Sequence, residues 1–168
     1  MLPVFSFNTV AADKSDITDA QIAHIVVTAN QVDIDAGNLA KKKASHKDVQ
    51  AYAHRMIGEH TDVNKQATDL ATKLKVRPQY NANSKDLKAE GNKNRDKLKG
   101  LTTGSEFDKA YLDGEVKLHQ QVIEVAGKKL VPNAKNEELK ALLIKVRPAL
   151  VSHLEHAKQL QAALADKR

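Results

Sequence analysis

Three histidines occupy the same kind of position in three separate stretches of this sequence. His60, His119 and His153 each stand in a row of residues spaced three and four apart, and the other members of these rows are apolar. A buried imidazole without a hydrogen-bond partner costs about 1–3 kcal/mol, so all three rings need partners if the rows face a core. Three rings at one depth can share an ion, a water molecule or a carboxylate. The pattern therefore predicts a metal site or a hydrogen-bonded cluster.

The residue types limit which metal such a site would take. The sequence contains no cysteine, so any metal is held by imidazole, carboxylate or water. The further candidate ligands, near the same rows or one turn from a histidine, are the residues Asp33, Asp35, Glu115 and His156. Imidazole and carboxylate together suit Zn, Cu(II), Ni, Mn or Fe. Three histidines and one aspartate would complete a tetrahedral zinc site, so zinc is the first expectation, with copper or iron as alternatives.

Two other functions fit the same residues. In the first, the histidines and Asp33 form a metal-free, hydrogen-bonded core that fixes the register of the helices. The protein is then a structural or interaction bundle that binds a partner through the basic segment Lys85–Lys99. The second is an oxidase with a metal pair, but the Glu-x-x-His motifs of di-iron bundles are absent and the apolar rows carry few carboxylates. No nucleophile motif or phosphate loop is present, so we expect a binding protein rather than an enzyme.

The apolar periodicity predicts four long helices that would position these residues. They span about residues 16–43, 47–75, 105–130 and 136 onward, and Asn136 is a good N-cap before two glutamates. The segment 77–104 is polar and basic, and we expect a short extra helix over 84–99 that lies across the bundle. Long helices with short connections pack as antiparallel neighbours. The predicted fold class is an all-α, antiparallel four-helix bundle with a short extra helix in the crossover between the second and third long helices.

One feature of the spacing argues against a single layer of histidines. Counted from a turn near Pro132, His119 lies 13 residues before the turn and His153 lies 21 residues after it. At about 1.5 Å of rise per residue, this difference predicts an axial offset of about 12 Å. Pro148, one turn before His153, could kink its helix and absorb part of the offset. Without such a kink, His119 and His153 belong to different layers.

The overall totals narrow the setting of the protein. A chain of 168 residues is one domain, and its net charge of +6 comes from 27 basic residues mixed among 21 acidic ones, so we expect no nucleic-acid partner. The apolar start ending in Val10-Ala11-Ala12 predicts that residues 1–12 are a signal-peptide remnant or a disordered N-terminus, followed by the bundle over 13–168. No other segment is apolar enough to span a membrane. The expected location is the periplasm.

Several stretches together resemble a known bacterial family. "TANQVDIDAGNLAKKKA", "VQAYAHRMIGEHTDVNKQATDLATKL", "FDKAYLDGEVKLHQQV" and "VRPALVSHLEHAKQL" are similar to the family called domain of unknown function 4142, over roughly residues 18–165. The resemblance implies a ferritin-like four-helix bundle that is periplasmic or associated with the outer membrane, and it implies little about activity. The family's acidic and histidine positions match the residues Asp33, Glu59, His60, His119, His153 and His156. Asp33 is shorter than the family's usual glutamate, so Asp35 is the alternative carboxylate.

Overall fold

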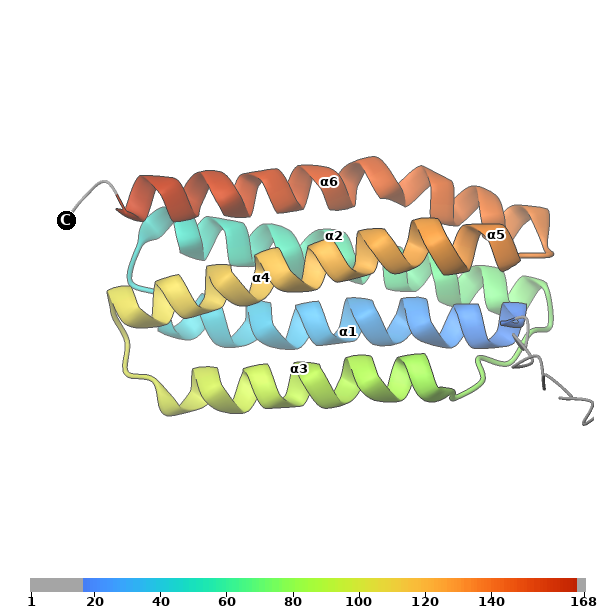
Figure 1. The fold of residues 1–168 in the computed structure, drawn as a ribbon, viewed down its shortest axis with the longest axis horizontal. Helices are drawn as coiled ribbons and strands as arrows, with labels where there is room; N and C mark the ends of the chain where they lie inside the picture. The colour runs from blue at the N-terminus through green and yellow to red at the C-terminus, as the bar shows by residue number, and fades with distance from the viewer. Residues whose placement is uncertain (1–16, 166–168) are drawn as a thin grey trace, which may run out of the picture.

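Helices make up nearly all of residues 17–165, the part of the chain that the structure, a computed structural model, describes (Figure 1). They are α1 (Asp19–Lys43), α2 (Lys47–Lys73), α3 (Ala82–Gly100), α4 (Ser105–Val125), the π-helical turn η1 (Ala126–Leu130), α5 (Val131–Asn133) and α6 (Glu137–Ala165). The prediction of an all-α fold is confirmed. The predicted signal-peptide remnant, residues 1–12, lies outside the described residues. Among the described helices, none is long and apolar enough to cross a membrane.

Four helices, α1, α2, α4 and α6, form the bundle, and each runs antiparallel to its packed neighbours (Figure 1). The α1–α2 and α4–α6 pairs follow from short connections, as the sequence predicts. The second and third bundle helices, α2 and α4, instead start at the same end and run parallel. The helix α3 makes this possible, because it carries the chain back along the whole length of the bundle before α4 begins.

The extra helix α3 lies lengthwise on the outside of α1 rather than across the bundle, so the predicted direction of this helix is wrong (Figure 1). Its buried leucines explain the difference. Leu87 and Leu98 are 11 residues apart, about three helical turns, so they anchor one face of α3 along its axis. At the end of both helices, the Lys43 ammonium group donates to the carbonyl oxygens of Leu98 at 3.1 Å and Lys99 at 3.0 Å. A cation at a helix C-terminus is also favoured by the helix dipole.

The connection between α4 and α6 sets the level of two candidate ligands. The helical path does not end near Leu130 but continues through η1 and α5 to Asn133, because a proline fits the first turn of a helix and Pro132 lies in the first turn of α5. The side chain of Asn136 then caps α6 by accepting from the amides of Glu138 and Leu139. Counted from Lys135, in the middle of this connection, His119 lies 16 residues before and His153 lies 18 residues after. The offset shrinks to two residues, about 3 Å.

The apolar core is divided into two clusters, one on either side of the position of Asp33 along α1. One cluster includes Ile22, Ile25, Leu130 and Leu143, and the other includes Met56, Phe107, Leu112 and Leu160. The residues buried between them are polar: Asn30, Asp33, His60, Glu115, His119 and His153. The polar layer is therefore enclosed by apolar packing at both ends.

Replacing Gly91 by alanine tests how tightly α3 must approach α1. A Cβ at Gly91 would lie 2.6 Å from both methyl groups of Val32, whereas a Cβ at Gly100 on the same helix would meet nothing within 4 Å. Both substitutions gain helix propensity, so their difference isolates the clash. We expect Gly91→Ala to unfold at lower urea concentration than Gly100→Ala, by about 1–3 kcal/mol in the free energy of unfolding. Equal stability of the two variants would show that α3 is not packed closely on α1.

Candidate metal centre

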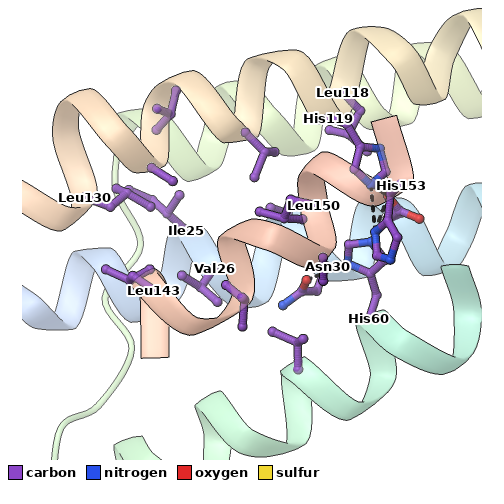
Figure 2. Close-up of a pocket in the computed structure, with 18 of the residues that line it drawn as sticks. Ile25, Val26, Asn30, His60, Leu118, His119, Leu130, Leu143, Leu150 and His153 are labelled. Carbon is purple, nitrogen blue, oxygen red and sulfur yellow. Dashed lines mark hydrogen bonds and ion pairs between the residues drawn. The ribbon is translucent and has the colours of Figure 1, made fainter. Parts of the chain in front are cut away.

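The three histidines meet in the middle of the bundle (Figure 2). His60 comes from α2, His119 from α4 and His153 from α6, and at most 5% of each side chain is exposed. Their ring centroids lie 5.1–5.6 Å apart, and Nε2 of His119 is 3.2 Å from Nδ1 of His153. The large axial offset that the residue count predicts is absent, because the turn lies further along the chain than Pro132. The rings share one level.

The ring of His60 is oriented by a chain of two asparagines. Its Nδ1 donates to Oδ1 of Asn30 at 2.7 Å, and the amide nitrogen of Asn30 donates to Oδ1 of Asn64 at 3.0 Å, which fixes which end of the Asn30 amide faces the ring. A neutral imidazole has one N–H, so Nε2 of His60 carries a lone pair. This nitrogen is buried and has no hydrogen-bond partner. The asparagines hold the ring while leaving its inner nitrogen free.

The other two rings are also held by acceptors at their outer nitrogens. Nδ1 of His119 donates to the main-chain carbonyl of Glu115 at 3.0 Å, and Nε2 of His153 donates to the carboxylate of Glu59 at 2.6 Å. A neutral imidazole has one N–H, and each of these rings uses it on its acceptor. When both rings are neutral, their inner nitrogens meet at 3.2 Å with a lone pair on each. A shared proton or a bound cation makes this contact favourable.

Two buried carboxyl groups adjoin the histidines. Oδ2 of Asp33 lies 3.4 Å from Nε2 of His60 and 3.6 Å from Nε2 of His119, and Oε2 of Glu115 lies 3.7 Å from Nδ1 of His119. Oδ1 of Asp33 and Oε2 of Glu115 have no hydrogen-bond partner. Within 4.8 Å, one group of ligand atoms comes from the three histidines, and a second comes from Asp33, Glu115 and His119. The polar layer thus holds two buried carboxyl groups, Asp33 and Glu115, beside the three histidines.

The structure does not bring Asp35 and His156 into this cluster. Asp33 and Asp35 are two residues apart on α1, about 200° around the helix, so only one of them can face the rings. Asp35 instead accepts from Gln31 at 2.8 Å and from Arg95 of α3 at 3.5 Å. The His156 ring is half-buried and packs edge-on against Tyr52, outside the cluster. The geometry therefore favours Asp33 over Asp35 as the carboxylate ligand.

Asn30 and Asn64 support the cluster but are not among the site residues predicted from the sequence. Asn30 is three residues before Asp33 on α1, and Asn64 is four residues after His60 on α2, so each lies on the same helix face as a candidate ligand. This spacing was the available signal. Glu59 directly precedes His60 and faces His153 on the neighbouring helix instead.

A cavity of about 90 Å³ extends from the histidines into the bundle interior (Figure 2). One part of it is lined by the three imidazoles, Asn30, Asp33 and Glu59, and the remaining wall is aliphatic, including Ile25, Leu118, Leu130, Leu143 and Leu150. The inner nitrogens therefore face a small space whose aliphatic wall offers them no hydrogen-bond partner.

Burial determines the charge of the cluster. It lowers the pKa of His60 to about 3, helped by repulsion from the other two histidines, and it lowers the pKa of His119 to about 4. Burial raises the pKa of Asp33 to about 8 and raises the pKa of Glu115 well above its ordinary value. Burial also favours a raised pKa at Glu59, but hydrogen bonds from Arg55 and His153 outweigh it and lower the pKa of this carboxyl. At neutral pH the imidazoles and the two buried carboxyls are uncharged.

These shifts predict that the metal-free protein is most stable near pH 6.5. Below that value, the unfolded chain binds protons at three histidines that stay neutral in the folded protein, so stability falls as pH falls. The two buried carboxyls act in the opposite direction, because they are protonated in the folded protein and ionised in the unfolded chain, but the three histidines outnumber them. From pH 6.5 to about 8, the folded Asp33 and Glu115 keep protons that the unfolded chain has lost, so stability falls as pH rises. Urea unfolding followed by circular dichroism at pH 5, 6.5 and 8 measures both limbs. Asp33→Asn should make the alkaline limb shallower, because Glu115 alone then keeps its proton, and a wild-type stability that rises from pH 6.5 to 8 would show that the folded protein does not hold these protons.

The fold and the cluster together define a class: an antiparallel four-helix bundle with a helical crossover and three histidines and two carboxyls buried at one level. Residues 6–160 match the family described as "Domain of unknown function (DUF4142)", and the chain belongs to that family. Among solved structures, "CopM in the Cu(II)-bound form" is similar to this chain, with a TM-score of 0.68 and 18% sequence identity over 88% of this chain and 98% of that one. This likeness is one of fold. No curated protein matches the sequence.

Proposed function

We propose that this protein binds one transition-metal ion between the inner nitrogens of His60, His119 and His153, with Asp33 as the carboxylate ligand. The observation that carries the proposal is the orientation of the rings: every outer nitrogen is held by an acceptor, and every inner nitrogen presents a lone pair to the same small space. Histidines that ligate metals characteristically donate their other N–H to such an acceptor, which fixes the ring and raises its basicity. The donor set therefore fits a metal ion.

Copper(II) replaces zinc as our first choice of metal. Three imidazoles and one carboxylate suit both ions, but sites of this kind bind Cu(II) more tightly than Zn(II). CopM, whose fold is similar to this one, was solved in a Cu(II)-bound form. We further propose that the ion is held for sequestration rather than for catalysis, in the periplasm, as the apolar N-terminal stretch supports.

Copper titration of purified variants tests the assignment. We expect the wild type to bind one Cu(II) per chain, with nitrogen hyperfine structure in its electron paramagnetic resonance spectrum. His119→Ala should weaken binding by at least about 100-fold, because it removes a central ligand. His54→Ala removes an exposed histidine of α2 and should leave the affinity unchanged. Equal Cu(II) affinity in His119→Ala and the wild type would contradict the site.

A metal-free structural role is the second candidate, because each ring already has one hydrogen-bonded acceptor. In that case the layer fixes helix register, and a partner binds through Lys85–Lys99, whose lysines line the exposed side of α3. Thermal unfolding separates the two functions. A ligand that binds only the folded state at about 100 times its Kd stabilises it by about 2.7 kcal/mol, so added Cu(II) should raise the Tm and a chelator should reverse the rise. A Tm indifferent to both would favour the metal-free role.

A further inference from the structure

The side chain of Arg55 lies in a group of polar side chains between α2 and α6, the Arg55 group, which contains Glu59, Ser152 and His156 and adjoins the histidine cluster. Its Nε donates to Oε1 of Glu59 at 2.8 Å, its Nη1 donates to Nδ1 of His156 at 3.3 Å, and its Nη2 donates to Oγ of Ser152 at 3.0 Å. The side chains of Arg55 and Glu59 are 30% and 43% exposed. A guanidinium cation is thus held by one carboxylate, one imidazole lone pair and one hydroxyl within reach of solvent.

Two residues, Glu59 and His153, connect the Arg55 group to the buried cluster. Glu59 accepts from Arg55 with one carboxylate oxygen and from Nε2 of His153 with the other, at 2.6 Å. His153 in turn presents its Nδ1 to His119 at 3.2 Å. His153 therefore has one nitrogen at Glu59 and the other at His119, and its ring connects the Arg55 group to the cluster.

A buried metal centre needs a path by which the ion arrives. The three histidines and Asp33 are at most 5% exposed, so solvated ions cannot contact them directly. Among the acceptors that hold the rings, Glu59 is the half-exposed one, while Asn30 and Glu115 are buried. The ionised Glu59 carboxylate is the first group of the site that an approaching cation can reach.

We propose that Glu59 and His156 form a surface capture site for a divalent transition-metal ion, in which Arg55 occupies the cation position until the ion displaces it. The inference rests on the proposed metal-binding function and adds a second position to it. Carboxylate and imidazole are ligands that Cu(II), Ni(II) and Zn(II) accept. Glu59 and His156 are both released when the Arg55 side chain swings into solvent. The ion then passes from Glu59 to the inner nitrogens as the Glu59–His153 contact opens. The role of the second histidine in "HLEHA" is therefore capture rather than final ligation.

Equilibrium binding of Cu(II) tests the capture site separately from the buried one. In Arg55→Gln, which removes the competing cation but keeps a side chain of similar length, we expect a second, weaker Cu(II) equivalent beside the buried one. The double variant Arg55→Gln/His156→Ala should return to one equivalent. Arg95→Gln is the matched control, since Arg95 also pairs with a carboxylate, that of Asp35, but belongs to α3 and lies outside the Arg55 group. It should keep one equivalent throughout.

Loading kinetics supply the second readout. Tyr52 donates to the main-chain carbonyl of His153, so bound Cu(II) should quench its fluorescence and report loading in a stopped-flow instrument. Charges at the rim of a site act mainly on association rates, so Arg55→Gln should load about tenfold faster and His156→Ala about tenfold more slowly. Release into a chelator should change by the same factor in each variant, leaving the Kd of the buried site within about threefold of the wild type.

The outcomes separate this inference from the proposed function. If the wild type binds no Cu(II), the buried site itself is wrong. If the wild type binds one Cu(II), but Arg55→Gln gains no second equivalent and both variants load at the wild-type rate, the buried site stands and the capture site is overturned. His156→Gln repeats the kinetic test if His156→Ala does not fold.

Discussion

The constraint on which the rest of this structure depends is the cost of placing imidazoles in an aliphatic core. A polar group buried without a hydrogen bond costs about 1–3 kcal/mol, and three rings enter the bundle at one level. The surrounding acceptors follow from that cost: Asn30, the Glu115 carbonyl and the Glu59 carboxylate each take one N–H. The two apolar clusters on either side then hold the helix faces that meet at the layer in fixed register.

The outer nitrogens each have an acceptor, whereas the inner nitrogen of His60 has no partner and those of His119 and His153 have only each other. This asymmetry distinguishes the layer from an ordinary polar core. A cluster whose purpose is only register would gain by pairing every nitrogen. Here His60 Nε2, Asp33 Oδ1 and Glu115 Oε2 remain without partners in the same small region. These atoms without hydrogen-bond partners lie where a cation would be most favourably placed. That arrangement is the link between the packing of this bundle and the metal binding that we propose.

Much of the fold and part of the site could be predicted from the sequence, because apolar spacing and caps are local signals. The periodicity located the four long helices, and the interruption of three apolar rows by histidine selected the rings that meet. Their common level could not be predicted, because it depends on where the α4–α6 turn falls. The sequence predicts a turn near Pro132, but this proline lies in the first turn of α5, and the helical path continues to Asn133. The choice between Asp33 and Asp35 depends on helix rotation, which the neighbouring α3 and its Arg95 help to set.

The interior void also affects the mechanics of the bundle. It lies between the π-helical turn η1, which contributes Ala126 and Leu130 to its wall, and the stretch of α6 around Pro148, which contributes Val146 and Ala149. At about 24 cal/mol per Å³, an empty space of about 90 Å³ corresponds to about 2 kcal/mol of forgone packing. Its elimination on unfolding would shrink the system by up to about 50 mL/mol, so hydrostatic compression acts against the native state. The bundle core is thus incompletely packed beside the histidines, and pressure should displace the helices there toward the void.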